Sequence, residues 1–264
     1  MSINNGFPIF IISLKSDIER RKKISRLLSD MNINYDFFDA IDYRSDLFKE
    51  KKQNALKNIA KNSYSDMTEP EIACMFSHLA VYQQILDRGL EWALILEDDV
   101  TFDHRVADLV DNLSKSTSNL KKRCTYVLGG QQGTSEYQLF GLSLRDVIKI
   151  GGVRLRKATY KKHKVTRACS YIVDRHYCQQ ALNLFFTHGF YLVDDRKILL
   201  ENDVMDEIYF CDIVTHPIVN TQNSHLEKSR IDKNKDFSIK ERNPITSYLL
   251  RLRYKLRVLI GSIF

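Results

Sequence analysis

The run of residues 92–96 contains only apolar side chains and is followed at once by three carboxylates, Glu97, Asp98 and Asp99. So short an apolar run predicts a strand that is buried on both faces, as in a sheet covered by helices. Three adjacent acids at the end of such a strand repel one another and raise one another's pKa. Either these acids turn the chain and cap the next helix, or a bound divalent cation compensates their charge.

A cation suits this position chemically. Mg²⁺ and Mn²⁺ prefer carboxylate oxygens, and open α/β sheets bind ligands at the carboxyl ends of their strands. A metal held by one or two carboxylates usually completes its coordination with substrate phosphates. It would neutralise the diphosphate leaving group of a nucleotide-sugar donor. The acidic triplet by itself leaves both explanations open.

The surrounding pattern predicts an α/β fold. Residues 8–14 predict another buried strand, followed by a helix over residues 18–31 and a short strand at residues 35–38. This β-α-β order makes the strands parallel and places helices on the faces of the sheet. We predict a Rossmann-like, mostly parallel sheet with flanking helices, in one large domain that suits a chain of 264 residues.

In other segments the residue pattern predicts secondary structure with differing clarity. Thr68 and Glu71 have the spacing of a capping box, which predicts a helix that continues to Gly89. Residues 131–164 are polar and basic and predict loops and short strands near a binding site. Residues 204–213 have a mixed hydrophobic pattern that predicts neither a helix nor a strand.

Most of the net charge of +7 belongs to the carboxyl end of the chain. Residues 240–264 hold six Lys or Arg and one acid, which is +5, so residues 1–239 hold only +2. A nearly neutral body argues against a nucleic-acid-binding protein. Within the tail, six apolar residues have a 4-3-4-3-4 spacing: Ile245, Leu249, Leu252, Leu256, Leu259 and Ile263.

This spacing predicts an amphipathic helix with basic flanks over residues 244–264, distinct from a domain of residues 1–243. A helix of this kind can lie on an anionic membrane surface. The alternative is a helix that docks on the body or in a dimer interface.

The five cysteines are widely spaced, without zinc-ligand or redox spacing, which predicts thiols in a reducing cytosol. The amino terminus has no signal-peptide pattern. We therefore expect a cytoplasmic protein, peripheral on the inner face of the cytoplasmic membrane.

Three segments, in this order, are similar to motifs of a known family. Residues 11–14 with Glu19-Arg20-Arg21 resemble its opening strand and basic helix. Residues 68–78 resemble its helix T-x-G-E-I-G-C-x-x-S-H, and residues 93–99 its strand A-L-I-L-E-D-D. The chain resembles glycosyltransferase family 25, which contains bacterial lipooligosaccharide galactosyltransferases and collagen galactosyltransferases.

The resemblance implies an A-type glycosyltransferase fold, an inverting mechanism, Mn²⁺ (or Mg²⁺) as cofactor and commonly UDP-galactose as donor. The acceptor would be a lipid-linked saccharide or an oligosaccharide of lipooligosaccharide or a related surface glycan. Asp99 would bind the metal, with Glu97 or Asp98 on the ribose or on metal-bound water. His216 and His225 are candidates for a further metal ligand, although either can be an ordinary histidine.

An inverting transfer needs one more carboxylate, which takes the proton from the acceptor hydroxyl. Asp194 is the first candidate for this base, because Val193-Asp194 resembles a later acidic motif of the family. Asp195 is the second candidate. Either acid could instead cap a helix or lie in a loop.

The turn after the first strand, with Ser13 and Leu14, is expected to contact the donor. The family's usual Asn and Arg there are Ser13 and Ser16 in this chain, so the donor could differ from UDP-galactose. Arg20 could reach a donor phosphate or lie on a solvated helix face. His78 is either a buried core histidine or a residue that supports the site.

Gly129-Gly130 could let the backbone approach a sugar closely. The alternative to an enzyme is a catalytically silent protein that binds a sugar or nucleotide and keeps the fold. Metal-dependent hydrolysis of the donor would separate the two.

Overall fold

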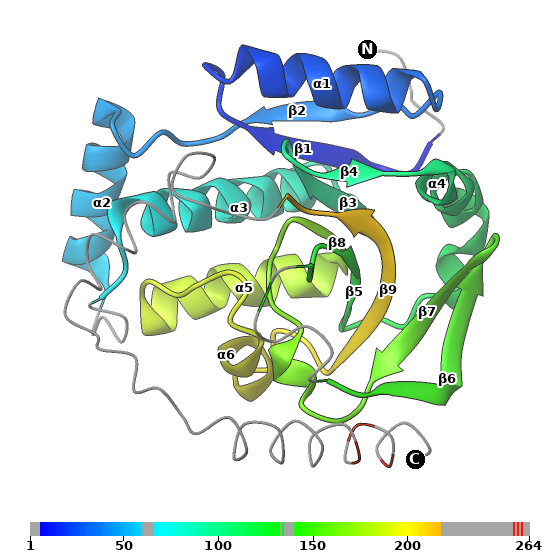
Figure 1. The fold of residues 1–264 in the computed structure, drawn as a ribbon. Helices are drawn as coiled ribbons and strands as arrows, with labels where there is room; N and C mark the ends of the chain where they lie inside the picture. The colour runs from blue at the N-terminus through cyan, green and yellow to red at the C-terminus, as the bar shows by residue number, and fades with distance from the viewer. Residues whose placement is uncertain are drawn as a thin grey trace, which may run out of the picture.

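The computed structural model describes residues 6–59, 66–132, 134 and 140–217, together with residues 256, 258 and 260. Within these residues the centre is one nine-stranded sheet of order β2-β1-β3-β8-β5-β9-β7-β6, with β4 paired to β9 (Figure 1). The strands are β1 (Ile9–Ser13), β2 (Asp36–Asp39), β3 (Trp92–Glu97), β4 (Thr101–Phe102), β5 (Cys124–Gly129), β6 (Leu142–Ile150), β7 (Val153–Ala158), β8 (Ser170–Asp174) and β9 (Glu207–Thr215).

Helices cover both faces of this sheet. They are α1 (Ile18–Ser29), α2 (Asp46–Asn58), α3 (Glu69–Asp87), α4 (His104–Ser116), α5 (Arg175–His188) and α6 (Arg196–Glu201). Single 3₁₀ turns are η1 (Thr117–Asn119) and η2 (Lys162–Lys164).

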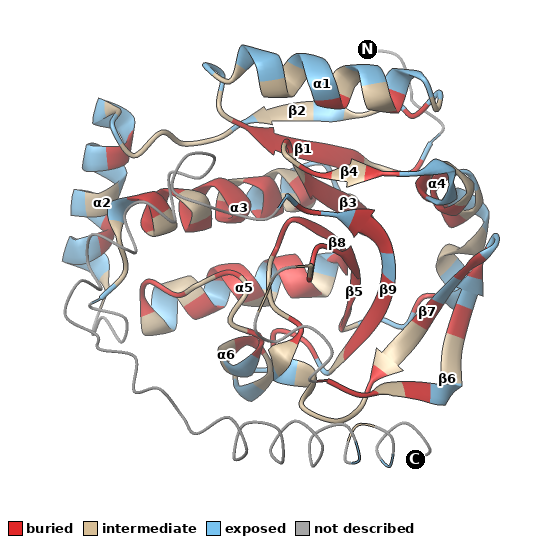
Figure 2. Cartoon of the chain, viewed as in Figure 1, coloured by how far each residue is buried: buried red, intermediate tan, exposed pale blue. Residues whose placement is uncertain are grey.

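The apolar pattern of the first strand explains why helices lie on both sides. Phe10 and Ile12 pack into a core with α3 and α5, whereas Ile9 and Ile11 pack into a second core with α1 and α4. Successive side chains of a strand point to opposite faces, so a strand without polar residues has to be covered twice. The central strands are accordingly buried (Figure 2). The predicted α/β class, a central sheet with flanking helices, is confirmed.

The prediction of a mostly parallel sheet is wrong for the second half of the chain. β1 is parallel to β2 and β3, and β5 is parallel to β9. However, β8 lies between β3 and β5 and is antiparallel to both. The segment from β7 to β8 contains only the short turn η2 and no crossover helix, so β8 is free to enter the sheet in the opposite direction. Hydrophobic periodicity carries no information on strand direction.

The expectation of loops and short strands in residues 131–164 is also wrong in part. β6 and β7 form an antiparallel hairpin of nine and six residues around Gly151-Gly152. The hairpin exposes charged residues such as Arg145 and Lys149 at the edge of the sheet, which weakens the apolar alternation of its sequence. β9, where the sequence pattern was mixed, is a nine-residue strand that is mostly buried.

The capping box at the start of α3 is confirmed. The backbone N–H of Thr68 donates to Glu71 Oε2 at 2.8 Å, and that of Glu71 donates to Thr68 Oγ1 at 3.4 Å. These bonds stabilise the first turn of α3, and Cys74 and His78 farther along the same helix lie beside the end of β3.

The predicted tail helix of residues 244–264 lies outside the described residues, except for Leu256, Val258 and Ile260. These three are helical, and the side chains of Leu256 and Ile260 are exposed. Membrane association and the division at residue 243 therefore stay predictions. In the described part of the chain, no helix combines the length and hydropathy needed to cross a bilayer.

Candidate active site

A cavity of about 290 Å³ lies at the carboxyl ends of β1 and β3. It gathers residues that are far apart in the sequence, from β1, α1, α3, β3 and the segments around residues 168, 193 and 216. Of the residues singled out in the sequence, those that line it are Ser13, Leu14, Arg20, His78, Glu97, Asp98, Asp99, Asp194 and His216. Asp195 caps α6 instead, where it accepts from the N–H groups of Lys197 and Ile198. His225 lies outside the described residues.

Asp98 is held by donors of the protein itself. Ser13 Oγ donates to Asp98 Oδ2 at 2.6 Å, and Arg20 Nη1 donates to Asp98 Oδ1 at 3.2 Å. Arg21 Nε donates to the same serine oxygen at 3.1 Å. Burial raises the pKa of Asp98, while Ser13 and Arg20 oppose that rise. The buried Asp98 and Ser13 therefore fix the turn after β3 against the end of β1.

Arg20 lies against the acids and not on a solvated helix face. Its Nη1 atom is 3.2 Å from Asp98 and 3.6 Å from Asp99 Oδ2. The guanidinium is partly buried and lines the cavity. It therefore brings positive charge to the place where a phosphate of a donor could bind.

Glu97, Asp99 and His216 form a group that could hold a cation, because one ligand atom from each lies within 4.8 Å of the others. His216 Nε2 is 3.4 Å from Asp99 Oδ1. That oxygen is buried and has no hydrogen-bond partner among the described residues. A buried carboxylate oxygen without a donor is costly unless a cation or a proton compensates it.

The second nitrogen of His216 supports this arrangement. His216 Nδ1 lies 2.8 Å from the carbonyl oxygen of Pro217, which can only accept, so we assign the ring proton to Nδ1. Nε2 then presents a lone pair toward Asp99. Histidines that bind metals usually donate their other N–H to such an acceptor. Two carboxylates and an imidazole are a donor set that fits Mn²⁺, with positions left for phosphate oxygens.

The two acids of this group have opposite pKa shifts. Burial favours the neutral form of Glu97, but His78, His216 and Arg167 outweigh it and hold the pKa of Glu97 below its ordinary value. Burial, followed by the charge of Glu97, raises the pKa of Asp99 to about 6. Burial and then the charge of Glu97 thus disfavour the ionised form of Asp99, and a bound cation would compensate both effects.

His78 lies in the core and also borders the cavity, so its supporting role in the site stays a prediction. It is fully buried, and its Nδ1 lies 2.7 Å from the hydroxyl of Tyr171. The hydroxyls of Tyr171 and Tyr82 are also 2.7 Å apart. On its other side His78 Nε2 faces Glu97 Oε1 at 3.5 Å. His78 is therefore a core histidine that also borders the site.

Asp194 lines the cavity and is oriented by the backbone. Its Oδ2 accepts from the N–H of Arg167 at 3.0 Å, so the other oxygen is available for an acceptor hydroxyl. Arg167 has a left-handed backbone, and its Nη1 donates to the carbonyls of Gly130 and Gln132. No sequence pattern singles out Arg167, because it precedes β8 in a basic loop.

A second arginine that the sequence did not single out, Arg196, supports the loop that contains Arg167. Arg196 is fully buried, and its guanidinium donates to the carbonyls of Val165 and Arg167 at 3.2 and 3.1 Å. Its position at the start of a helix suggests an exposed residue, so local pattern could not have identified it.

The two glycines after β5 are required by internal packing. A Cβ atom on Gly129 would overlap the carbonyl of Val214, and one on Gly130 would overlap the sulfur of Cys169. Gly130 also has a φ of +81°. Close approach to a sugar is therefore not needed to explain them.

Comparison with known proteins identifies the family. The family model described as "Glycosyltransferase family 25 (LPS biosynthesis protein)" matches residues 7–196. The chain belongs to glycosyltransferase family 25. The resemblance drawn from three sequence motifs is thus confirmed.

Several known proteins are similar to this family 25 chain. Procollagen galactosyltransferase 2 from Homo sapiens is 32% identical over 120 residues, which are 42% of this chain and 19% of that protein. Lipooligosaccharide biosynthesis protein lic2B from Haemophilus influenzae is 35% identical over 91 residues, 34% of this chain and 33% of that protein. The inactive glycosyltransferase 25 family member 3 from Mus musculus is 32% identical over 103 residues, 37% and 17% of the two chains.

The matched regions span between about a sixth and a third of these relatives. Among solved structures, a glycosyltransferase involved in the glycosylation of the major capsid of PBCV-1 has a TM-score of 0.43 at 10% identity. The match covers 82% of this chain and 96% of that one. A likeness at this level assigns neither a donor nor an acceptor.

Proposed function

We propose that this family 25 protein is an inverting, metal-dependent glycosyltransferase. It transfers a hexose, with galactose from UDP-galactose as the first candidate, to a saccharide acceptor of lipooligosaccharide or a related surface glycan. The observation that carries the proposal is the group Glu97, Asp99 and His216, in which the buried Asp99 Oδ1 has no hydrogen-bond partner among the described residues. This group lies in the cavity at the carboxyl end of β3.

We assign a different role in the transfer to each polar residue of the cavity. Bound Mn²⁺ would supply positive charge to the diphosphate as the sugar–phosphate bond breaks. Glu97, Asp99 and His216 would hold it, and Asp98 keeps the turn that carries Asp99 in place through Ser13. Arg20 adds a second positive charge on the side of α1.

Asp194 is proposed to act as the base. As the acceptor oxygen forms its bond to the anomeric carbon, the bond from that carbon to the phosphate oxygen breaks and the nucleoside diphosphate leaves. The proton of the acceptor hydroxyl passes to the carboxylate of Asp194, whose orientation is fixed by the N–H of Arg167.

Asp194→Asn is expected to lower transfer to an acceptor by roughly 10²–10⁴-fold while donor binding is retained, because Asn cannot take the proton. Asp195→Asn is the matched control, since Asn is an equally good helix cap and should leave transfer nearly unchanged. Turnover would be followed as release of the nucleoside diphosphate from the full-length chain. Equal losses in both variants would reject Asp194 as the base.

The donor can be identified without knowledge of the acceptor. Ligands that bind the native state raise its melting temperature, so a panel of nucleotides and nucleotide-sugars with and without Mn²⁺ should single out UDP and one UDP-hexose. Slow, Mn²⁺-dependent hydrolysis of that donor is expected as well. Stabilisation by a nucleotide-sugar without any hydrolysis would favour the catalytically silent binding protein. Two relatives of this chain are named as inactive or probable inactive members of the family.

We also propose that residues 244–264 attach the protein to the cytoplasmic membrane surface, where a lipid-linked acceptor would be found. The support is the apolar stripe with basic flanks in the sequence. Removal of residues 244–264 is expected to abolish sedimentation with vesicles that contain anionic lipid, whereas donor hydrolysis continues. Sedimentation of the shortened chain to the same extent would reject this role.

A further inference from the structure

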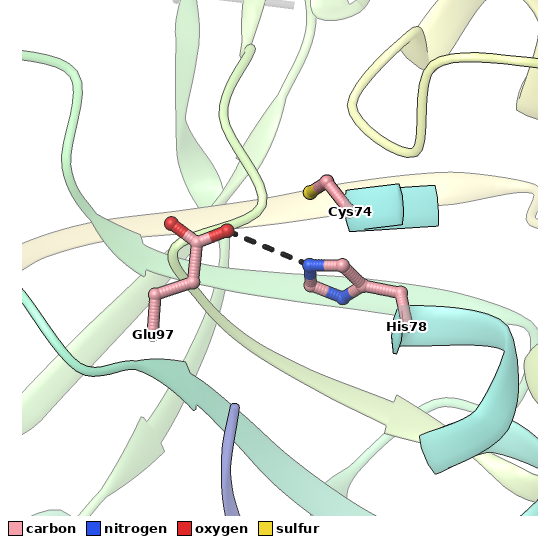
Figure 3. A group of neighbouring side chains, drawn as sticks. All are labelled: Cys74, His78 and Glu97. Carbon is pink, nitrogen blue, oxygen red and sulfur yellow. Dashed lines mark ion pairs between the residues drawn. The ribbon is translucent and has the colours of Figure 1, made fainter. Parts of the chain in front are cut away.

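A second group of donor atoms borders the site and contains a thiol. One ligand atom each from Cys74, His78 and Glu97 lies within 4.8 Å of the others. Cys74 and His78 are four residues apart on α3, so both side chains lie on the same face of the helix. Figure 3 shows both of them pointing toward Glu97 at the end of β3.

His78 and Glu97 lie at ion-pair distance, and this spacing also fits two ligands of one ion. His78 Nε2 and Glu97 Oε1 are 3.5 Å apart, longer than a normal hydrogen bond. Around a tetrahedral Zn²⁺ with bonds of about 2.0–2.1 Å, two such ligands would be roughly 3.3–3.5 Å apart. His78 is fully buried, and its Nε2 has no hydrogen-bond partner in the described part of the chain. It is therefore a buried polar atom aimed into the cluster.

The opposite side of the imidazole is already oriented. His78 Nδ1 lies 2.7 Å from the Tyr171 hydroxyl, which is in turn 2.7 Å from the Tyr82 hydroxyl. With Nδ1–H donating to Tyr171, a cation bound beside Glu97 would meet the lone pair of Nε2 in place of a proton. A partner on the non-ligating nitrogen fixes the tautomer and ring plane of metal-binding histidines.

We propose that Cys74, His78 and Glu97 form a second cation site, which binds a thiophilic divalent cation of the Zn²⁺ class. The three protein ligands leave one coordination position open toward the cavity, into which Cys74 and Glu97 are partly exposed. The thiolate excludes Mg²⁺ and disfavours Mn²⁺, which prefer oxygen ligands. Binding replaces the thiol proton, which passes to solvent.

Glu97 belongs to both donor groups, this one and the group with Asp99 and His216. A carboxylate bound to Zn²⁺ beside His78 is drawn away from the Asp99 side, so the two cations are expected to exclude each other. This consequence, unlike Zn²⁺ binding itself, rests on the proposed Mn²⁺-dependent function.

The test uses Co²⁺ as a spectroscopic substitute for Zn²⁺ on the tag-free, full-length protein. Coordination by a thiolate produces a sulfur-to-cobalt charge-transfer band, which carboxylate and imidazole ligands alone do not produce. We expect this band to saturate at one Co²⁺ per chain, to vanish on addition of Zn²⁺, and to persist in excess Mg²⁺. Absence of the band in the wild-type protein would overturn the proposal.

Two alanine variants locate the thiol. Cys74→Ala should lose the band, whereas Cys169→Ala should keep it, because Cys169 lines the same cavity but lies outside the donor group. The opposite pattern, or equal bands in both variants, would also overturn the proposal. Melting curves of both variants without metal would verify that each is folded.

Exclusion between the cations is measured separately, from the electron paramagnetic resonance signal of unbound Mn²⁺. Zn²⁺ is expected to release Mn²⁺ from the wild-type protein and to do so at least tenfold less effectively from Cys74→Ala. Equal release from both proteins would show that Zn²⁺ displaces Mn²⁺ directly at the Asp99 group, which would contradict exclusion through the thiol site. If Mn²⁺ does not bind at all, the proposed metal-dependent function is wrong. The cobalt band still shows whether the site with Cys74 binds a metal.

Discussion

Asp99→Asn is expected to raise the melting temperature of the metal-free protein and to abolish its stabilisation by Mn²⁺ with UDP. The side chain is largely buried beside Glu97, and its pKa is raised from 3.8 to about 6. Ionised Asp99 therefore destabilises the metal-free fold at neutral pH, by ~1–2 kcal/mol after allowance for its partial exposure. Asparagine removes this charge, and with it an anionic ligand of the proposed Mn²⁺ site.

The sign of the pH dependence follows from the direction of the shift. Because the pKa of Asp99 in the folded protein lies above its ordinary value of 3.8, the protonated group stabilises the fold in acid. That stabilisation is lost as the pH rises through about 6. The free energy of unfolding of Asp99→Asn should therefore exceed that of the wild type by more at about pH 8 than at about pH 5.

Urea denaturation at both pH values, without and with Mn²⁺ and UDP, measures these effects. Asp103→Asn is the matched control, because Asp103 is an exposed helix cap whose pKa is lowered by Arg105, and its replacement should not stabilise the protein. A metal-free Asp99→Asn protein that is less stable than the wild type would contradict the electrostatic account. Full stabilisation of the variant by Mn²⁺ and UDP would place the metal elsewhere.

Gly129→Ala is expected to lower the free energy of unfolding by roughly 3 kcal/mol or more, or to prevent folding. A Cβ atom at this position would overlap the backbone carbonyl of Val214, and backbone cannot move aside as a flexible side chain can. The same carbonyl accepts from the N–H of Gly130 at 2.8 Å, where the pairing of β5 with β9 shifts its register. Displacing β9 there would also displace His216, two residues beyond Val214.

Gly6→Ala is the matched control for this variant. In the described structure nothing lies within 4 Å of the position that its Cβ would take, so the change should be nearly neutral. Midpoints of urea unfolding for the two variants and the wild type provide the comparison, and Mn²⁺ binding by any folded Gly129→Ala protein should be weakened. Equal stability of all three proteins would show that β5 and β9 can separate without cost at this point.

The sequence by itself determined the features that depend only on residues close together in the chain. The apolar runs of β1 and β3 required helices on both faces, the capping box set the start of α3, and the three acids after β3 marked the position of the site. Each of these follows from the burial or hydrogen bonding of neighbouring residues, so a local pattern is sufficient to predict it.

Only the tertiary structure decided which residues meet. Strand direction depends on connections and not on periodicity, so the antiparallel β8 was missed. The sequence could not separate Glu97 from Asp98 as the acid on the ribose or on metal-bound water, but the fold turns Asp98 to Ser13, 85 residues away, and leaves Asp99 beside His216. The hydrogen bonds and charges that separate these roles come from segments distant in the chain, and their energies depend on burial that exists only once the sheet is assembled.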